Sequence, residues 1–492
     1  MLVSYPDDAA FGDLTSLARI IEALDQFNEF VGSDPAGRRS LEWREKLRVS
    51  MPDQGEGLES VLKELCETVI PNGLRNGHPG FSGWVTTSPT TSGTAATLAS
   101  TVAGSQRFWV QAFNLLEEVS LDWLKRLLGF PSTWQGTYCT GGSSANLIAL
   151  GAARQWAVEQ QGVDPAMTGM PDGMKWRIYA SSEVHHVVNR AAAVLGIGRR
   201  SVVPIPVNSR RELDLGALES RLRADREEGW LPMSLVATAG TVNTGAIDPI
   251  RGMLDLAKEF GTWLHVDGAY GMFGVLDSRV AELYDGVAEA DSVALDPHKW
   301  LAAPVGNGVA MVRDRALLGR AFTLEPASYL EGSADSAEQH IVQSPFDDFG
   351  VPYHDFNLDQ SAPSRGVQVW AILKEIGRKG MIERVVRHNS FARRLEEVVR
   401  DSPQLEVLSP AVLSICCFRF IVDGQDDESL NSLNRRIASA LRAEGTYVPS
   451  TTMLEGRFAI RPCYINPRAR LDDVEGLASR VIEIGNNLLA SN

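Results

Sequence analysis

The chain has 492 residues, of which 44% are hydrophobic and 22% are charged, and its 44 glycines and 24 prolines show no periodic run. This composition is typical of a globular protein with room for about three domains, and it excludes fibrous and disordered classes. The formal net charge of −15 opposes a general attraction to nucleic acid or anionic membrane, so we expect neither as a main partner.

Cysteine usage and the N-terminal residues indicate a location. The cysteines are odd in number and lack the paired spacing of a zinc site, which predicts reduced core thiols and no metal: Cys66, Cys139, Cys416, Cys417 and Cys463. The N-terminus has no basic segment followed by an apolar stretch, and about 18 consecutive apolar residues occur nowhere. We therefore expect no signal peptide, no membrane span and a cytoplasmic protein.

Two amphipathic helices are predicted within residues 1–85. Apolar residues fall at helical spacing from Leu14 to about Phe30, and again from Leu58 to Val69. The chain between them is rich in Pro, Gly, Ser and charged residues, so the two helices cannot form a core of their own. We expect this segment to pack on another surface, and a partner subunit is the expected one.

Short β-branched runs alternate with helical segments from about residue 135 to 315. The predicted strands are Gly136–Thr140, Ser201–Ile205, Ser234–Ala239, Trp263–Val266, Ser292–Leu295 and Gly308–Val312, with helices such as Leu213–Arg226 and Met253–Phe260 between them. This alternation predicts an α/β fold in which helices cover both faces of a mostly parallel sheet. Ligands of such sheets bind beyond the carboxyl ends of the strands.

The rest of the chain predicts a long loop and a smaller domain. Leu330 to Asn357 is rich in Ser, Asp, Glu, Gln and Gly, which is typical of a lid or of a disordered segment. Beyond it, the predicted helices are Val367–Ile376, Met381–Val399, Glu428–Ala443 and Leu471–Leu489, and the predicted strands lie near Leu405–Leu408, Leu413–Phe420 and Phe458–Ile460. We predict an N-terminal helical segment (1–85), a large α/β domain (86–365) and a small C-terminal α+β domain (366–492).

A lysine follows one predicted strand in the sequence SVALDPHKW, residues 292–300. Lys299 is either a solvated loop residue or an amine held in a dry pocket for a reaction. A lysine in such a pocket can lose its proton and form a Schiff base with an aldehyde.

An aspartate ends another predicted strand in the sequence TWLHVDGAYG, residues 262–271. Asp267 could simply form a turn. In a pyridoxal-phosphate site, however, a carboxylate beside the pyridine nitrogen keeps that nitrogen protonated, and the resulting cation is the electron sink. Because parallel strands end at one edge of the sheet, we expect Asp267 and Lys299 to project at the same edge.

Two further motifs lie where strands meet helices. TGGSSAN, residues 140–146, offers backbone N–H groups and hydroxyls to a phosphate at a helix N-terminus, although Ser143 could serve only as a helix cap. SEVHHVV, residues 182–188, is predicted to open a helix, so His185 and His186 cannot both face one ligand. A histidine there either stacks on a flat cofactor or has a structural role.

The order and spacing of these four motifs resemble those of the group II pyridoxal-phosphate-dependent amino-acid decarboxylases, which include aromatic-L-amino-acid, histidine and glutamate decarboxylases. The likeness runs from His78-Pro79 through Glu117 and Asp122-Trp123-Leu124 to near Arg461, and HVDGAYG and DPHKW are its specific elements. The resemblance implies the type I fold of pyridoxal-phosphate-dependent transferases and pyridoxal phosphate as the cofactor. It also implies an amino-acid substrate, release of an amine and CO2, and an obligate homodimer with shared active sites.

By this resemblance, Lys299 carries the cofactor and Asp267 is the partner of the pyridine nitrogen. The other implied cofactor contacts are His185 and Ala269 on the two ring faces, Thr238 near the ring substituents, Gly142, Ser143 and His298 at the phosphate with Asp296 nearby, and Ser361 from the neighbouring subunit.

The segment FTLEPASYL, residues 322–330, resembles the start of the mobile catalytic loop of the family. In that loop a tyrosine protonates the substrate α-carbon after CO2 leaves, and Tyr329 matches it. Family members that form aldehydes commonly have another residue at this position, so the match favours simple decarboxylation. Closure of residues 324–350 would exclude water and place Tyr329. Aldehyde synthesis, transamination and an inactive scaffold remain the alternatives.

The resemblance places the substrate side-chain pocket in the segment from His78 to Thr91. Phe81, Trp84, Thr87 and Phe108 are the candidate pocket residues, although aromatic residues near a site are as often core. The Asn-Gln-containing segment of animal glutamate decarboxylases is absent, which counts against an acidic substrate. We therefore predict an aromatic amino acid, with decarboxylation of histidine, glutamate or another amino acid as the alternative.

Overall fold

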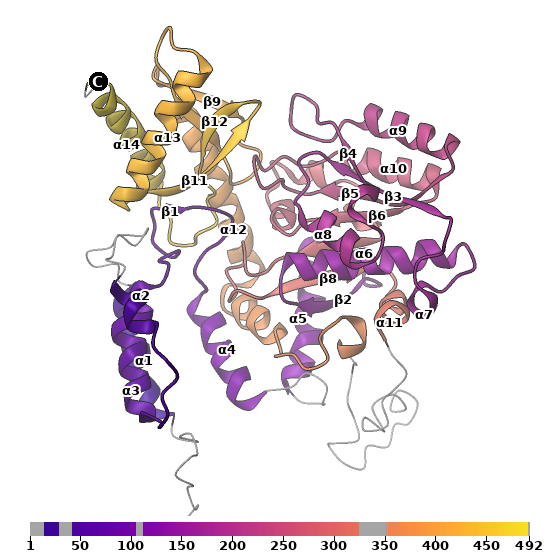
Figure 1. The fold of residues 1–492 in the computed structure, drawn as a ribbon, viewed down its shortest axis with the longest axis horizontal. Helices are drawn as coiled ribbons and strands as arrows, with labels where there is room; N and C mark the ends of the chain where they lie inside the picture. Colours follow the sequence, from indigo (N-terminus) through magenta and orange to yellow (C-terminus); the bar gives the residue numbers. More distant parts are fainter. Residues whose placement is uncertain (1–13, 29–41, 105–111, 324–350, 352, 491–492) are drawn as a thin grey trace, which may run out of the picture.

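The computed structural model describes residues 14–28, 42–104, 112–323, 351 and 353–490. Figure 1 shows a group of N-terminal helices beside a large α/β body, with a smaller sheet and its helices above the N-terminal group. The predicted fold class, a mostly parallel sheet covered by helices with a smaller C-terminal α+β part, is confirmed. The boundaries predicted at residues 85 and 365 stay a prediction.

The large sheet has seven strands in the order β2-β8-β7-β6-β5-β3-β4. They are β2 (Gln135–Cys139), β3 (Lys175–Ser181), β4 (Val202–Ile205), β5 (Trp230–Thr238), β6 (Trp263–Asp267), β7 (Ser292–Leu295) and β8 (Gly308–Val312). Strands β4, β3, β5, β6 and β7 pair in parallel, whereas β8 is antiparallel to both β7 and β2. Strand β3 was not predicted, because its sequence, KWRIYAS, mixes charged and aromatic residues instead of forming an apolar run.

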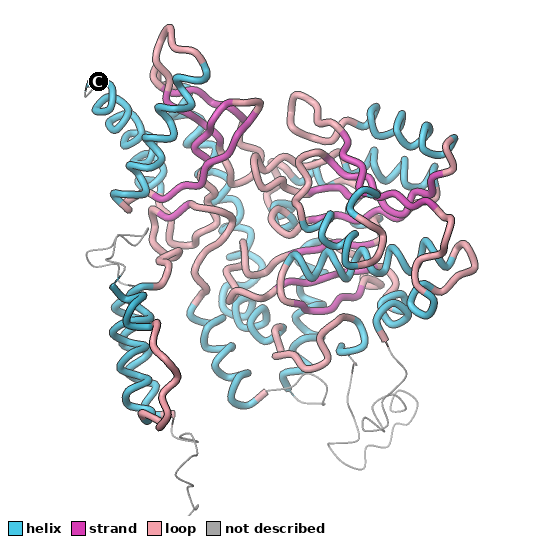
Figure 2. Tube along the Cα trace, viewed as in Figure 1, coloured by secondary structure: helices cyan, strands magenta, loops and turns pink. Residues whose placement is uncertain are grey.

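Helices cover both faces of this sheet (Figure 2). The helices in contact with its strands are α5 (Ala112–Leu128), α6 (Gly142–Glu159), α8 (Val187–Val194), α9 (Leu215–Glu227) and α10 (Ile250–Phe260). Further out, α7 (Pro165–Thr168) and α11 (Ala316–Phe322) pack on α6, and α4 (Thr91–Ala103) and α5 pack on α12 (Gly366–Arg400). Alternate residues of β6 enter different cores: Leu264 and Val266 pack with residues of α9 and α10, while Trp263 packs with residues of α6. Both faces of the sheet are thus buried, as a parallel sheet requires.

The smaller sheet has the order β1-β11-β12-β10-β9. Its strands are β1 (Phe81–Ser82), β9 (Leu405–Ser409), β10 (Cys417–Phe420), β11 (Val448–Leu454) and β12 (Arg457–Arg461), and the helices α13 (Asp427–Glu444), α14 (Leu471–Ala490) and α12 pack on it. Strand β1 pairs in parallel with β11, so the segment just after the N-terminal helices completes the C-terminal sheet. The two helices predicted on either side of residue 377 are both present as the two parts of α12, and Gly377 at φ 65° breaks the helix between them.

The N-terminal helices α1 (Ala18–Asn28), α2 (Glu42–Leu47) and α3 (Gly57–Glu64) lie beside the main body (Figure 1). Helix α3 continues as a π-helical turn, Leu65–Val69. Arg19 of α1 forms an ion pair with Glu59 of α3. Among the described residues of 14–27 and 42–76, Leu62 is the only large apolar residue that is buried. These helices therefore hold almost no apolar core of their own, as the sequence predicted.

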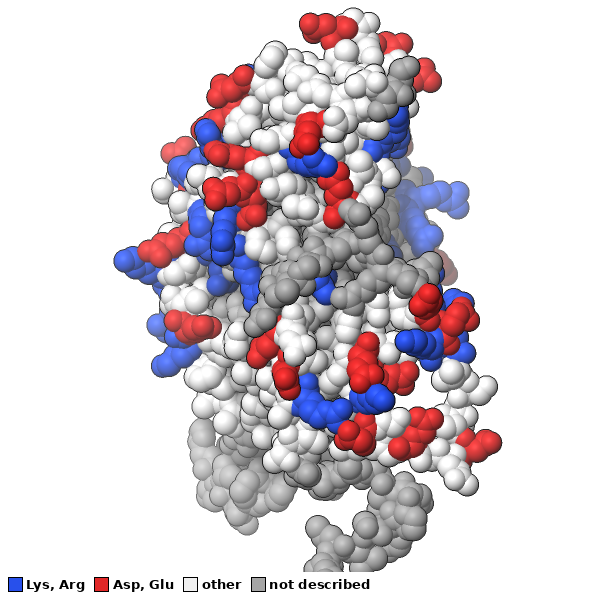
Figure 3. Space-filling model, turned by 90° about the vertical axis from the view of Figure 1, so that its left-hand side faces the viewer, with Lys and Arg blue, Asp and Glu red and all other residues white. Residues whose placement is uncertain are grey.

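The distribution of charge on the surface and the length and apolarity of the helices indicate what the protein can bind. Figure 3, which views the side that carries the N-terminal helices, shows acidic and basic side chains interspersed with uncharged ones. Within the described parts of the chain, no helix is both long enough and apolar enough to span a bilayer.

Candidate active site

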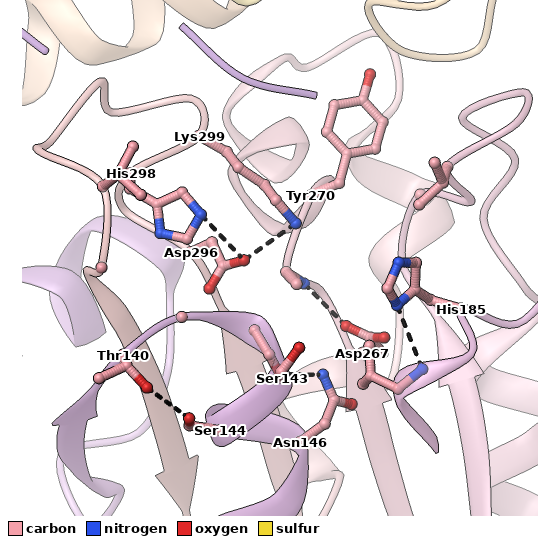
Figure 4. A pocket seen from close by; sticks show the side chains of 18 of the residues that line it. Thr140, Ser143, Ser144, Asn146, His185, Asp267, Tyr270, Asp296, His298 and Lys299 are labelled. Carbon is pink, nitrogen blue, oxygen red and sulfur yellow. Dashed lines mark hydrogen bonds and ion pairs between the residues drawn. The ribbon is translucent and has the colours of Figure 1, made fainter. Parts of the chain in front are cut away.

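A cavity of about 330 Å³ lies beyond the carboxyl ends of the central parallel strands, where helix α6 begins (Figure 4). Strands β5, β6 and β7 end level with one another, because Thr238 pairs with Asp267 and Asp267 pairs with Ala294. The side chains that follow these strands therefore converge on one space, which is where ligands of such sheets bind.

Most of the cofactor contacts predicted from the sequence line this cavity. They are Gly142, Ser143, His185, Thr238, Asp267, Ala269, Asp296, His298 and Lys299. Other residues of the predicted motifs also line it, namely Thr140, Gly141, Ser144, Asn146, Val187 and Tyr270, together with Gly240, Val242, Val305 and Gly306, which lie outside those motifs. The exception is Ser361, which is exposed and does not line the cavity of its own chain.

Lys299 forms an ion pair at the base of the cavity. Its Nζ lies 3.0 Å from Oδ2 of the buried Asp296, and the backbone N–H of Lys299 donates to the carbonyl of Asp296. Nε2 of His298 lies 3.7 Å from the same carboxylate oxygen. Nδ1 of His298 is 2.7 Å from the carbonyl oxygen of Asn307, which can only accept, so this nitrogen carries a proton. A buried carboxylate thus holds the lysine amine where Figure 4 shows it, inside the cavity.

Asp267 and His185 project from two further strand ends. Asp267 is buried at the end of β6, and its Oδ1 accepts a hydrogen bond of 3.2 Å from the backbone N–H of Ala269. His185 follows β3, and its Nδ1 accepts a 3.4 Å hydrogen bond from the backbone N–H of Val187. Burial lowers the pKa of His185 and the neighbouring His186 lowers it further, whereas the Asp267 carboxylate raises it.

The two histidines precede helix α8 instead of opening it, because α8 begins at Val187. This corrects the helix start predicted for the sequence SEVHHVV. His186 is exposed, while His185 lines the cavity, so the two rings do have different surroundings.

The first turn of α6 forms another wall of the cavity. Gly141 precedes this helix at φ 123°, which favours glycine, and α6 begins at Gly142. A Cβ atom on Gly142 would lie 2.7 Å from Oδ2 of Asp296 and 3.0 Å from the Cβ of Ala269, so only glycine lets the helix approach this closely. The first N–H groups of a helix have no partner within the helix, and together with the Ser143 hydroxyl they suit an anion.

A second set of polar residues lies beneath this turn and was missed by the sequence reasoning. Asn146 of α6 is 2.9 Å from Nε2 of His265, and Nδ1 of His265 is 2.9 Å from the Ser292 hydroxyl. The detectable signal was a histidine two positions before Asp267 on a buried strand, since alternate strand residues share a face.

The buried ring of His265 predicts a loss of stability in acid. Burial lowers its pKa to about 4, so between about pH 4 and 6.5 the unfolded chain binds a proton that the folded protein does not. The unfolding free energy should therefore fall by ~3 kcal/mol on this account from about pH 7 to about pH 4. Urea titrations at several pH values should show this slope, and His265→Gln should remove that part of it. An unchanged slope in the variant would contradict the prediction.

Of the candidate substrate-pocket residues, Phe81, Trp84 and Thr87 do not line this cavity in the single chain. Phe81 and Thr87 are buried, and Trp84 is 61% exposed with its ring centroid 6.0 Å from that of Phe81. Phe108, Tyr329 and the predicted lid lie outside the described residues. Their roles stay predictions.

The residues present fit pyridoxal phosphate. An amine (Lys299), a buried carboxylate (Asp267) and a helix N-terminus line one cavity, matching the aldehyde, the ring nitrogen and the phosphate of the cofactor. Oδ1 of Asp296 is buried and has no hydrogen-bond partner among the described residues, so the base of the cavity still has a free acceptor. Within the described residues, no group of three or more His, Cys, Asp or Glu side chains is arranged to hold a metal ion.

Comparison with known proteins gives a consistent result. Residues 41–421 match the pyridoxal-dependent decarboxylase conserved domain. The aromatic-L-amino-acid decarboxylase of Bacillus atrophaeus is 30% identical over 435 residues, covering 88% of this chain and 86% of that protein. The L-2,4-diaminobutyrate decarboxylase of Acinetobacter baumannii is 26% identical over 90% of this chain and 86% of that protein. The crystal structure of Oryza sativa TDC with PLP and tryptamine superposes with a TM-score of 0.87 at 23% identity, covering 97% of this chain and 100% of that one.

Proposed function

Because the chain belongs to the pyridoxal-dependent decarboxylase family, whose conserved domain covers residues 41–421, we propose that it decarboxylates an aromatic L-amino acid to the corresponding amine and CO2. The family makes it an amino-acid decarboxylase that uses pyridoxal phosphate. The observation that carries the assignment to this site is that Lys299, Asp267 and the start of α6 line one cavity.

When bound, pyridoxal phosphate supplies an electron sink for the bond that breaks at the substrate α-carbon. Lys299 would hold the cofactor through its Nζ, and the Asp296 carboxylate 3.0 Å away would orient that amine. Asp267 would keep a proton on the ring nitrogen, and His185 and Ala269 would hold the two ring faces. Ser143 and the first turn of α6 would hold the phosphate, with His298 beside it.

We propose that the substrate carboxylate meets no arginine in this cavity, and that this favours loss of CO2 over transamination. None of the described residues that line the cavity is an arginine. Arg461, on the nearby strand β12, is buried and donates to the carbonyls of Trp84 and Val242 instead. A substrate carboxylate without a guanidinium partner loses solvation on entering the cavity, which favours its departure as neutral CO2. Tyr329 is our proposed proton donor to the α-carbon.

The aromatic substrate is supported by relatives that are named as aromatic-L-amino-acid, tyrosine and tryptophan decarboxylases. The alternative supported by a relative is 2,4-diaminobutyrate. We propose that Phe81, Trp84, Thr87 and Phe108 contribute to the substrate pocket, where the rings of Phe81, Trp84 and Phe108 would suit an aromatic substrate.

The test is CO2 release from Phe, Tyr, Trp, DOPA, His, Glu and 2,4-diaminobutyrate, with amine and aldehyde measured in the same samples. We expect an aromatic amino acid to lead in kcat/KM by at least about tenfold and to give one amine per CO2, because an aromatic pocket leaves a charged side chain unpaired. A lead for diaminobutyrate would overturn the substrate class, and aldehyde as the main product would overturn the reaction.

We also propose a homodimer in which the partner's surface covers the N-terminal helices. Ile21 of α1 is 55% exposed and Val61 of α3 is 52% exposed, and apolar surface of this kind commonly marks an interface. The exposed Ser361 would then belong to the cavity of the other subunit. A cytoplasmic location is supported by five cysteines that form no disulfide.

Charges placed on this apolar surface should dissociate the dimer. Ile21→Glu combined with Val61→Glu should convert a dimer into monomers at micromolar concentration, because a buried unpaired carboxylate costs several kcal/mol in an interface. Sedimentation velocity measures the change. Met167→Glu is the matched control, since Met167 is 81% exposed on helix α7 of the large domain. A wild-type protein that sediments as an active monomer would contradict the proposal.

A further inference from the structure

A continuous chain of hydrogen bonds runs beneath the cavity, from strand β6 to the first turn of α6. Nε1 of Trp263 donates to Oγ of Ser292 over 2.8 Å, and that hydroxyl is 2.9 Å from Nδ1 of His265. Nε2 of His265 is 2.9 Å from Oδ1 of Asn146, whose Nδ2 donates over 2.8 Å to the carbonyl oxygen of Gly142. The four side chains that form these hydrogen bonds are all buried.

The direction of every hydrogen bond in this chain is determined by its two ends. The Gly142 carbonyl can only accept, so the Asn146 amide presents Nδ2 to it and Oδ1 to His265. Nε2 of His265 must then carry the proton. At the other end, the Trp263 indole can only donate, so the Ser292 hydroxyl accepts from it and donates its own proton to Nδ1 of His265. The neutral imidazole protonated at Nε2 satisfies the whole chain, and its low pKa agrees with that state.

The hydrogen-bond chain links two elements of the site, the strand β6 and the start of helix α6. Trp263, His265 and Asp267 are alternate residues of β6 and lie on the face that α6 covers. Asn146 and Gly142 line the cavity at the start of α6. The hydrogen bonds therefore connect the strand that carries Asp267 with the helix turn that offers its N–H groups.

We propose that His265 is a positioning residue which, through Asn146, fixes the first turn of α6 relative to Asp267 and so sets the anion-binding geometry of the cavity. This inference rests on the proposed function above, in which that turn holds the cofactor phosphate. Burying four polar side chains gives no advantage over apolar residues of similar shape unless their hydrogen bonds position something. The chain ends on a backbone carbonyl of the anion-binding turn, which is the group it would position.

Two substitutions at His265 separate positioning from packing. The glutamine amide reaches the place of Nε2, so His265→Gln can still donate to Asn146. The shorter asparagine amide reaches the place of Nδ1, so His265→Asn keeps the contact with Ser292 and loses the one with Asn146. Both variants put an amide of similar polarity into the same buried position, which makes each the control for the other.

The experiment uses the full chain with the cofactor removed, and titrates it with pyridoxal phosphate and, separately, with inorganic phosphate. We expect His265→Asn to raise both dissociation constants by about tenfold, and His265→Gln to stay within about threefold of the wild type, since one positioned hydrogen bond is at stake. Thermal unfolding of the cofactor-free variants shows whether the two are equally stable.

A histidine ¹⁵N NMR spectrum of the wild-type protein shows directly which ring nitrogen of His265 carries the proton. The resonance that disappears in His265→Gln should show a neutral ring with its proton on Nε2. A proton on Nδ1, or equal dissociation constants for the two variants, overturns the inference alone. A wild-type protein that binds neither pyridoxal phosphate nor phosphate overturns the proposed function as well.

Discussion

Lys299→Ala is expected to abolish decarboxylation, with a loss of at least about 10³-fold in kcat, because the amine that would hold the cofactor and exchange protons with it is gone. The visible absorbance that the bound cofactor gives with a lysine should disappear in the same variant. Lys299 lines the cavity with its Nζ 3.0 Å from Asp296, so its removal changes the reacting centre directly.

Lys299→Arg separates charge from chemistry at this position. A guanidinium preserves the positive charge beside Asp296 and hence the local electrostatics, but it stays protonated and cannot replace the amine. We therefore expect Lys299→Arg to fold as stably as the wild type and to remain inactive. Lys258→Ala is the matched control, because Lys258 forms an exposed ion pair with Glu289 on the outside of the large domain. Substantial activity in Lys299→Arg would contradict the assigned role of the amine.

The strand ends that form the site could be predicted from the sequence because each motif follows a short apolar run. Strands β6 and β7 end where TWLHVDGAYG and SVALDPHKW predicted, which places Asp267 and Lys299 at one edge of the sheet. Local patterns carry this information, since parallel strands must end together at the site. Strand β3 was missed because tertiary burial, and not its own apolar content, makes it a strand.

Contacts between distant parts of the chain could not be predicted in the same way. His265 and Asn146 are 119 residues apart, and their hydrogen bond depends on how α6 lies across β6. The ion pair of Lys299 with Asp296 spans three residues, yet it requires the turn after β7 that brings both side chains into the cavity. Strand β1 joins the C-terminal sheet through its pairing with β11, which no local pattern indicates. Such contacts follow from packing, which sequence periodicity does not contain.

Asp267→Asn should leave the cofactor bound and still reduce kcat by about 10²- to 10³-fold, the size expected when one preorganised electrostatic contact to the reacting centre is lost. An amide has nearly the shape of a carboxylate, and its oxygen can still accept from the backbone N–H of Ala269. What it lacks is the negative charge that would keep a proton on the ring nitrogen. The measurement is kcat under saturating cofactor, alongside the dissociation constant of the cofactor.

The control for this substitution is an aspartate that binds the other end of β6 from the segment before β7. Oδ2 of Asp291 accepts a 2.8 Å hydrogen bond from the backbone N–H of Leu264 in β6, at the end away from the cavity. Asp291→Asn therefore makes the same chemical change beside the same strand without touching the site, and it should lower stability while leaving kcat within about twofold of the wild type. If Asp291→Asn lost as much kcat as Asp267→Asn, the loss would come from disturbing β6, and Asp267 would have no special part in the reaction. A large difference between the two assigns the effect to the carboxylate charge inside the cavity.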